Sequence, residues 1–102
     1  TVSFDKPELI TTTVSEISRN GAVSGGTITS DGGSPVIERG ICWKISPNPL
    51  ITDNRTIDGT GPGAFSSILT GLTPETTYYL RAYATNKGGT SYGNELIFIT
   101  AP

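Results

Sequence analysis

The side chains that could carry catalysis are few in this sequence and widely spread. It has nine aspartate and glutamate residues, no histidine and a single cysteine. General acid–base catalysis near neutral pH usually depends on a histidine or on carboxyl groups with perturbed pKa values. The carboxyl groups here are scattered through expected loops and strand edges. We therefore expect no catalytic residues, and we interpret the chain as a protein that is not an enzyme.

The single cysteine, Cys42, has no partner for covalent chemistry. One cysteine cannot form an internal disulfide, and without a histidine it cannot belong to a Cys–His nucleophile pair. We expect Cys42 to be a small buried or half-buried hydrophobic residue. The glycine-rich stretch 59–63 lacks the lysine and the serine or threonine of a phosphate-binding loop, so we interpret it as a turn. No cofactor is expected.

Asp53, Asn54 and Asp58 bring oxygen ligands close together in the sequence, and calcium prefers oxygen ligands. Their spacing does not fit a calcium-binding loop of the EF-hand kind, and loop Asp and Asn residues mostly stabilise turns. We expect no metal site here. Asn54-Arg55-Thr56 matches the N-glycosylation pattern, but such triplets often occur by chance.

The composition excludes two classes of partner. The chain of 102 residues has a net charge of −2 and no basic cluster, so it lacks the electrostatic footprint of a nucleic-acid-binding protein. No apolar stretch approaches the roughly 20 residues of a membrane-spanning helix. The length fits a single domain over residues 1–102. Since the chain starts without methionine, we interpret it as part of a longer protein or as a mature form.

Short strands separated by turns are the dominant pattern. No stretch repeats apolar residues at helical spacing, whereas β-branched or alternating runs end at turn residues about every 8–12 positions, as in sandwiches and barrels. Asn20-Gly21 is a strong hairpin signal. We expect seven antiparallel strands, over residues 9–14, 22–29, 36–45, 55–57, 64–69, 76–86 and 95–100.

The longest expected strand, 76–86, has one apolar face. Side chains alternate between the two faces of a strand. One face carries apolar side chains that decrease in size along the strand, and we expect it to be buried. The other face places a charge between two rings, and we expect it to face solvent. The inner residues are Tyr78, Leu80, Ala82 and Ala84, and the outer residues are Tyr79, Arg81, Tyr83 and Thr85.

The region around this strand resembles fibronectin type III domains. Leu72, Pro74, Thr76 and Tyr78 match the family's L-x-P-x-T-x-Y pattern, and the match continues through Ala82, Ala84, Asn86, Gly88, Phe98 and Thr100. The resemblance implies a seven-stranded Greek-key sandwich of the immunoglobulin-like kind, with Leu72 in a structural role. It also implies that Tyr78 is a tyrosine corner whose hydroxyl bonds to nearby backbone.

A narrower resemblance concerns the residues 39–43, 83–86 and 92–93. They are similar to the fibronectin type III variant found in bacterial secreted and cell-surface proteins, where it occurs as one module among several, often beside carbohydrate-active domains. The resemblance implies a secreted or surface-anchored protein, extracellular or periplasmic.

The chain departs from the family at its tryptophan. Fibronectin type III domains usually bury a tryptophan on the second strand, where this chain has Gly26. Its only tryptophan is Trp43, on the third strand. Alternation places Ile41, Trp43 and Ile45 on one face, so we expect Trp43 to fill the space beside Gly26. The same register also turns Arg39 inward, at the end of the sheet.

Tyr79, Arg81 and Tyr83 form the best candidate for a binding surface. Rings beside a guanidinium can stack on sugars or on a partner's side chains, and Tyr and Arg are enriched at binding hot spots. The structural alternative is that Tyr83 covers Gly40 on a neighbouring strand while Arg81 pairs with Glu38. We expect Tyr92 to be a packing lid before the last strand.

The resemblance favours a non-catalytic module that holds neighbouring domains of the same chain apart and oriented, with contacts to protein partners. Residues 1–7 and 101–102 would be linker ends at opposite ends of the sandwich. The alternative is an adhesion module that binds polysaccharide or another surface protein through Tyr79, Arg81 and Tyr83. Edge strands could also pair between copies.

Overall fold

The short runs read from the sequence form eight antiparallel strands in the computed structural model, which describes residues 5–102. None of the described residues forms a helix, and so no helix long and apolar enough to cross a membrane is present among them. The strands are β1 (Glu8–Ser15), β2 (Ala22–Ser30), β3 (Glu38–Lys44), β4 (Asn54–Arg55), β5 (Gly63–Leu69), β6 (Thr77–Asn86), β7 (Gly89–Tyr92) and β8 (Leu96–Ile99).

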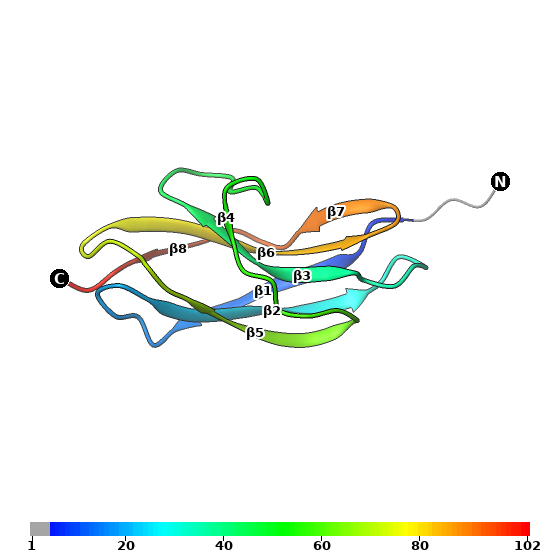
Figure 1. The fold of residues 1–102 in the computed structure, drawn as a ribbon, viewed down its shortest axis with the longest axis horizontal. Helices are drawn as coiled ribbons and strands as arrows, with labels where there is room; N and C mark the ends of the chain where they lie inside the picture. Colours follow the sequence, from blue (N-terminus) through cyan, green and yellow to red (C-terminus); the bar gives the residue numbers. More distant parts are fainter. Residues whose placement is uncertain (1–4) are drawn as a thin grey trace.

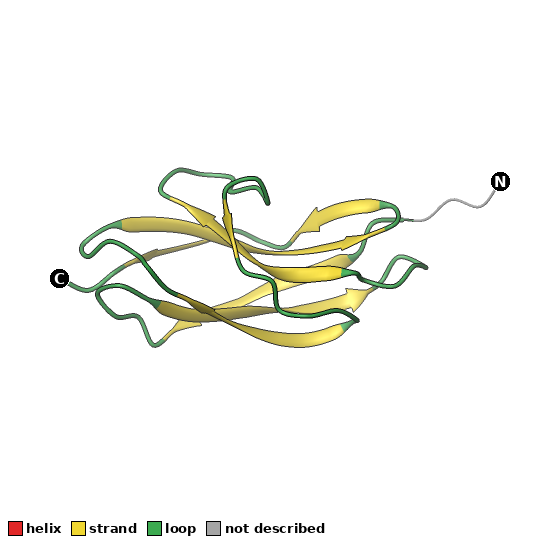
Figure 2. Ribbon diagram, in the orientation of Figure 1, coloured by secondary structure: helices red, strands yellow, loops and turns green. Residues whose placement is uncertain are grey.

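Two sheets pack face to face as a sandwich (Figures 1 and 2). The smaller sheet has the order β1-β2-β5, and the larger one has the order β4-β3-β6-β7, with β8 also paired to β6. β6 is the central strand of the larger sheet, with β3 along one edge and β7 and β8 along the other. The all-β antiparallel class predicted from the sequence is confirmed.

The predicted number of seven strands is wrong by one, because β7 was not expected and the predicted last strand began only at residue 95. β7 pairs with the end of β6 and β8 pairs with its beginning. Between them the Gly93 N–H still donates to the Ala82 carbonyl at 2.8 Å, so the chain follows β6 throughout. Tyr92, expected to lie before the last strand, closes β7. The Gly93–Glu95 interruption is what divides the strand.

The Asn20-Gly21 signal does mark a reversal, but not a two-residue hairpin. The connection between β1 and β2 runs from Glu16 to Gly21, and Glu16 takes the left-handed conformation at φ 48°. The Ser18 N–H donates to the Gly21 carbonyl at 2.8 Å, which closes the tip of the loop. The Asn-Gly pair therefore ends a six-residue loop.

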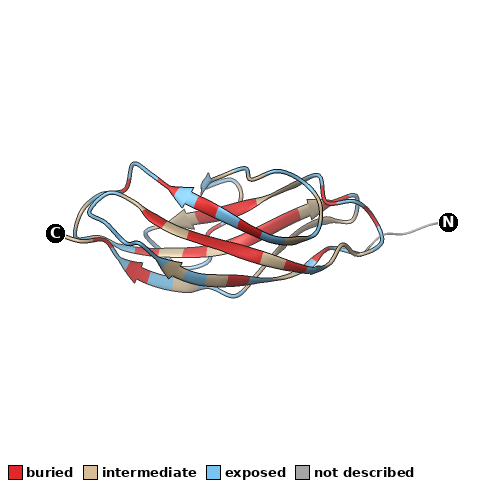
Figure 3. Cartoon of the chain, turned by 90° about the horizontal axis from the view of Figure 1, so that it is seen from below, coloured by how far each residue is buried: buried red, intermediate tan, exposed pale blue. Residues whose placement is uncertain are grey.

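The core lies between the sheets, on the face of β6 that alternation predicted. Leu80, Ala82 and Ala84 are fully buried and Tyr78 is nearly so. Leu72 from the preceding turn joins the same cluster. Figure 3 shows this alternation of buried and more exposed residues along the strands. The apolar face of β6 therefore holds the two sheets together, as expected.

Tyr78 forms the predicted tyrosine corner. Its hydroxyl accepts a hydrogen bond from the Thr73 N–H at 2.9 Å, five residues upstream. Its ring stacks on Phe98 with centroids 5.7 Å apart. Because a buried phenol needs a hydrogen-bond partner, this contact lets the ring enter the core while it ties down the turn before β6.

The prediction that Trp43 fills the space at Gly26 is wrong. A Cβ at Gly26 would lie 2.7 Å from the Ala82 Cβ and 3.0 Å from the Phe65 ring, so these neighbours occupy the space. Trp43 is half-buried at the margin of the core. Ile45, expected on the same inner face, lies beyond β3 and is 69% exposed, since the strand ends at Lys44.

Arg39 turns toward the core side at the end of β3. Its guanidinium lies 5.2 Å from the centroid of the Phe65 ring, where a cation over an aromatic face is attracted to it. Its N–H groups donate to the carbonyls of Asp58, Gly61 and Pro62 at 3.0–3.2 Å. Loop carbonyls at the margin of the sandwich therefore stabilise the charge by accepting its hydrogen bonds.

The two ends of the described chain are attached to the sandwich. Residues 1–4 of the expected linker lie outside the described residues, but Asp5 accepts the Asn86 side-chain amide at 2.7 Å and Pro7 is buried. At the other end, the Ala101 N–H donates to Ser18 at 3.0 Å. Residues 5–7 and Ala101 thus pack on the domain, at opposite ends of it (Figure 1).

Candidate functional site

The structure does not bring Tyr79, Arg81 and Tyr83 together as an open surface. All three point to the outer side of β6, as alternation predicted, but Tyr83 is fully buried, with 0% exposure. The chain after β4 covers it, and the Tyr83 hydroxyl donates to the Thr56 carbonyl. The expected exposure of Tyr83 is therefore wrong, because a crossing segment lies over the sheet at this point.

Gly40 makes this close cover possible. It is the register partner of Tyr83, as the structural alternative proposed. A Cβ on Gly40 would collide with the backbone of Thr56. The chain at Thr56 therefore packs directly against β3 and covers the Tyr83 ring. Burial, together with the Glu38 carboxylate 3.0 Å from the hydroxyl, raises the pKa of Tyr83 well above its usual value.

Arg81 does not pair with Glu38, which corrects the second half of that alternative. The register sets Glu38 opposite Thr85 and Arg81 opposite Cys42, so the two charges are too far apart along the strands. Glu38 instead forms an ion pair with Arg55 at 3.1 Å.

The Arg81 guanidinium is held by the loop after β3 and by the ring of Tyr92. Its Nε donates to the Pro49 carbonyl at 2.7 Å, and its central carbon lies 4.0 Å from the centroid of the Tyr92 ring. The Tyr92 hydroxyl accepts the Ile51 N–H at 3.1 Å, so Tyr92 packs over this loop from β7. The planar face that could stack on a sugar is thus used inside the domain.

Tyr79 is the one ring of the expected row that remains partly open, being half-buried. It lies in register with Lys44 on one side and the exposed Ile97 on the other. Lys44 forms an ion pair with Asp53 at 3.5 Å. One accessible ring, in place of two rings and a guanidinium, removes the geometry for stacking along a glycan chain.

Cys42 is fully buried beneath the loop after β3, as expected of a small hydrophobic residue. Its Sγ lies 3.5 Å from the carbonyls of Pro49 and Arg81. Burial raises the pKa of the thiol to about 11, although the nearby Arg81 charge opposes this. Since the thiolate is the nucleophilic form, Cys42 is unsuited to covalent catalysis at neutral pH.

The carboxylates considered for calcium bind different protein groups. Asp53 accepts the Leu50 N–H at 2.8 Å, and Asp58 accepts the Thr56 hydroxyl at 2.8 Å. The Asn54 amide donates to the Trp43 carbonyl at 3.2 Å. Within residues 5–102 no cluster of three or more metal-ligating side chains is present. These residues fix the crossing segment in place.

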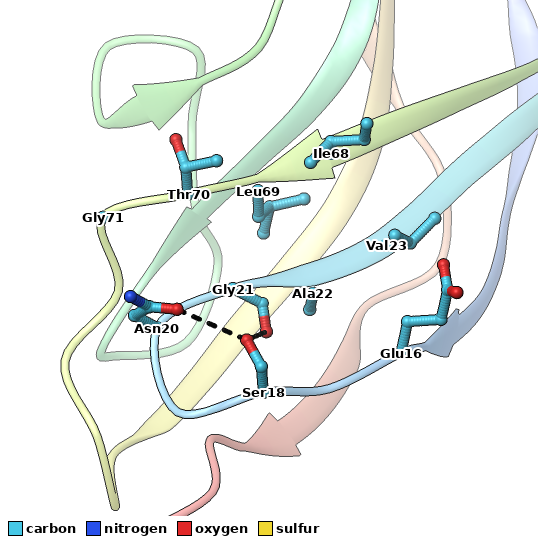
Figure 4. Close-up of a pocket in the computed structure, with 10 residues that line it drawn as sticks. All are labelled: Glu16, Ser18, Asn20, Gly21, Ala22, Val23, Ile68, Leu69, Thr70 and Gly71. Carbon is cyan, nitrogen blue, oxygen red and sulfur yellow. Dashed lines mark hydrogen bonds between the residues drawn. The ribbon is translucent and has the colours of Figure 1, made fainter.

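Two shallow grooves were not predicted from the sequence. The larger, of about 310 Å³, lies between the β1–β2 loop and the end of β5 (Figure 4). Its lining includes the polar residues Glu16, Ser18 and Asn20 and the apolar residues Val23 and Ile68. Only the Asn-Gly pair of the loop marked this region in the sequence.

The smaller groove, of about 240 Å³, lies between β1 and β8. Its lining is mainly apolar and includes Val14, Ile17 and Phe98. Ile17 and the neighbouring Ile97 are also exposed. No pattern in the sequence distinguishes these isoleucines from core residues. Their exposure depends on how far apart the two sheets lie at this groove, which is a property of the tertiary structure.

Comparison with known proteins supports the fold alone. No protein-family model matches the chain. No curated protein matches it either. Solved structures do match: a human fourth FNIII domain is 20% identical, with a TM-score of 0.70, and the match covers 99% of this chain and 84% of that one. The chain therefore has a fibronectin type III-like sandwich fold.

A bacterial structure of similar length matches as well. It is the short sensor domain of the anti-sigma factor RsgI4 from Pseudobacteroides cellulosolvens, 22% identical, with a TM-score of 0.67 and coverage of 97% of this chain and 98% of that one. The titin fragment A168–A170 is 22% identical with a TM-score of 0.65. That match covers 98% of this chain, which spans 33% of the titin fragment.

Proposed function

We propose that this chain is a non-catalytic fibronectin type III-like module of a larger protein, and that it holds neighbouring domains at a set distance and orientation. The observation that carries the proposal is the attachment of both described chain ends at opposite ends of the sandwich. When the polypeptide enters a module at one end and leaves it at the other, successive domains are arranged in a row. Rigid attachment of both chain ends then fixes the orientation of the neighbouring domains relative to the module.

At the N-terminal end, two hydrogen bonds and a buried proline hold the chain. The Asp5 N–H donates to the Gly32 carbonyl at 3.1 Å, and the Asp5 carbonyl accepts the Asn86 side chain. That amide also donates to the Asp31 carbonyl at 2.6 Å, so one buried side chain joins the chain before β1 to the β2–β3 loop. The entering chain is therefore tied to the body of the domain.

At the C-terminal end, Ala101 is bonded on both sides. Its N–H donates to the Ser18 carbonyl at 3.0 Å, and its carbonyl accepts the Glu75 N–H at 3.2 Å. The preceding Thr100 is buried, and its hydroxyl donates to the Thr73 carbonyl at 2.6 Å. These contacts favour a fixed direction for the leaving chain.

A secreted or surface-anchored bacterial parent is part of the same proposal. Its support is the residue pattern around Trp43 and Tyr83, together with a bacterial structure of similar fold and length. Neighbouring domains of the same chain are the proposed partners. The alternative of polysaccharide or protein binding through Tyr79, Arg81 and Tyr83 is disfavoured, because Tyr83 is buried and Arg81 is held by the loop after β3.

The experiment is a distance measurement between the two ends by pulsed electron spin resonance. Spin labels on Asp5→Cys and Pro102→Cys report the ends, while Ile37→Cys and Arg19→Cys report the body of the domain. The buried Cys42 does not compete for the label. We expect the end-to-end distance distribution to be about as narrow as the body reference. A much broader distribution would overturn the spacer role.

A further inference from the structure

The loop between β1 and β2 contains a solvent-exposed asparagine that is followed by a glycine. Asn20 is exposed at the tip of the loop and is followed by Gly21. An asparagine side chain can reach its own following backbone, and glycine has no Cβ to hinder that approach. We propose that Asn20 is a site of spontaneous deamidation, with solvent water as the only co-reactant.

The hydroxyl of Ser18 is placed to assist this reaction. Its Oγ lies 3.4 Å from the Asn20 Oδ1 and donates toward it (Figure 4). A donor aimed at a carbonyl oxygen stabilises the negative charge that develops there when the carbon is attacked. The same hydroxyl also lies 3.2 Å from the Gly21 carbonyl, so its single proton is shared between these two acceptors.

The reaction balances without any oxidant or reductant. The Gly21 backbone nitrogen bonds to the Asn20 Cγ, the Cγ–Nδ2 bond breaks, and ammonia leaves with the proton of the Gly21 N–H. Water then opens the cyclic imide at either carbonyl carbon. Cleavage on the side-chain side yields aspartate, and cleavage on the main-chain side yields isoaspartate. The net change is one amide and one water converted to one carboxylate and ammonium.

The four other asparagines lack this combination. Asn48 precedes a proline, which has no N–H to attack with. Asn54 donates to the Trp43 carbonyl, Asn86 is buried, and Asn94 accepts the Thr11 N–H at 2.8 Å. Each of these three is followed by a long charged residue instead of glycine. The structure therefore singles out Asn20.

The modification would act on the C-terminal end of the domain. The Asn20 carbonyl accepts the Leu72 N–H at 3.0 Å, and the Ser18 carbonyl accepts the Ala101 N–H. Isoaspartate lengthens the backbone by one methylene and turns that Asn20 carbonyl into a free carboxylate. Both products add a negative charge to the lining of the larger groove, which also includes Glu16. We expect the loop, and with it the attachment of Ala101, to loosen.

The test follows deamidation of the whole chain by peptide mass spectrometry during incubation at mildly alkaline pH, with fragmentation that separates isoaspartate from aspartate. We expect the folded protein to convert Asn20 while Asn54, Asn86 and Asn94 stay intact. An Asn20 that survives in the folded protein but converts in urea would overturn the proposal, since the loop would then be protective. The Asn20→Gln variant is the control for assignment of the product.

Two further measurements separate the parts of the proposal. Deamidation of Asn20 should be several-fold slower in the Ser18→Ala variant than in the wild type. Deamidation at the same or a higher rate would show that the Ser18 hydroxyl does not assist the reaction. Hydrogen exchange of the Leu72 and Ala101 amides should become faster in the isoaspartate product. Unchanged exchange would refute the effect on the chain end. The modification itself does not depend on the proposed spacer role.

Discussion

Cys42 and Tyr83 are the two groups whose chemistry the fold suppresses most. Both side chains lie on the outer side of the larger sheet, and both are fully buried because the chain between β3 and β5 crosses over them. Burial favours the neutral forms of a thiol and a phenol and raises both pKa values. Reactivity in this region therefore reports whether the covering segments are in place.

The Cys42 thiol is expected to react slowly with iodoacetamide in the folded protein. Its pKa is raised from 9.0 to about 11, so the thiolate is scarce at neutral pH, and the covering loop also blocks access. Alkylation rates measured against pH, folded and in urea, check this. Rapid reaction of the folded protein with an apparent pKa near 9.0 would contradict the buried position.

Tyr83→Phe is expected to change how stability depends on alkaline pH. Since the folded pKa of Tyr83 lies above the ordinary value of 10.0, its protonated form is favoured by folding. That stabilisation is complete below pH 10.0 and is lost as the pH rises above it. Because the variant lacks this hydrogen bond, its free energy of unfolding at neutral pH should be about 0.5–1.5 kcal/mol lower than that of the wild type. As the pH rises above 10.0, the stability of the variant should fall less steeply than that of the wild type.

The free energy of unfolding, measured by urea denaturation across this pH range, tests the Tyr83 prediction. The comparison is best made in a Cys42→Ala background, because the thiol also titrates in the alkaline range. Parallel alkaline declines for the two proteins would show that Tyr83 does not titrate differently on folding.

At the scale of elements, β6 organises the domain through its two faces. The inner face packs on the smaller sheet, where β2 contributes Gly26 opposite Ala82. The outer face is covered at Tyr83 and Arg81, whereas Tyr79 and Thr85 on the same face are half-buried. The close approach of β2 to β6 therefore depends on a residue without a side chain.

Gly26→Ala is expected to destabilise the domain by about 1–3 kcal/mol, because the added methyl would overpack the space already held by Ala82 and Phe65. Thr27→Ala on the outer face of the same strand is the control, with an expected change within about 0.5 kcal/mol. Urea denaturation of both variants is the measurement. Equal stabilities would mean that the sheets separate more easily than this packing suggests.

At the scale of the whole molecule, the two ends are tied down by different means. A side-chain amide of Asn86 secures the entering chain, whereas backbone hydrogen bonds of Ala101 secure the leaving chain. A single substitution can therefore free one end and leave the other attached. This asymmetry gives a direct test of whether rigid ends matter to the module.

Asn86→Ala should widen the end-to-end distance distribution measured with labels at positions 5 and 102. Loss of the amide removes the hydrogen bonds to the carbonyls of Asp5 and Asp31. The body reference between positions 37 and 19 should keep its width, which separates local release from unfolding. A distribution as narrow as that of the wild type would show that the Asp5 N–H bond to the Gly32 carbonyl and the buried Pro7 hold the entering chain without the amide.

Much of the fold was predictable because it depends on local rules. Alternation within residues 76–86 identified the inner face of β6, and the residue pattern around Tyr78 identified the tyrosine corner. β7 was missed, because it is only four residues long and lies between the expected strands at 76–86 and 95–100. The alternation of side chains between the two faces of a strand follows from local backbone geometry, so it can be predicted from the sequence.

The sequence by itself determined which side of a sheet each residue of β6 faces, and with it the sandwich class. Only the tertiary structure decided what covers that side. Tyr83 points outward as predicted, yet it is buried because a segment distant in sequence crosses Gly40. The face to which a side chain points follows from backbone geometry within one strand. Whether another segment covers that face depends on contacts between residues far apart in the sequence. The predicted binding row was lost for that reason.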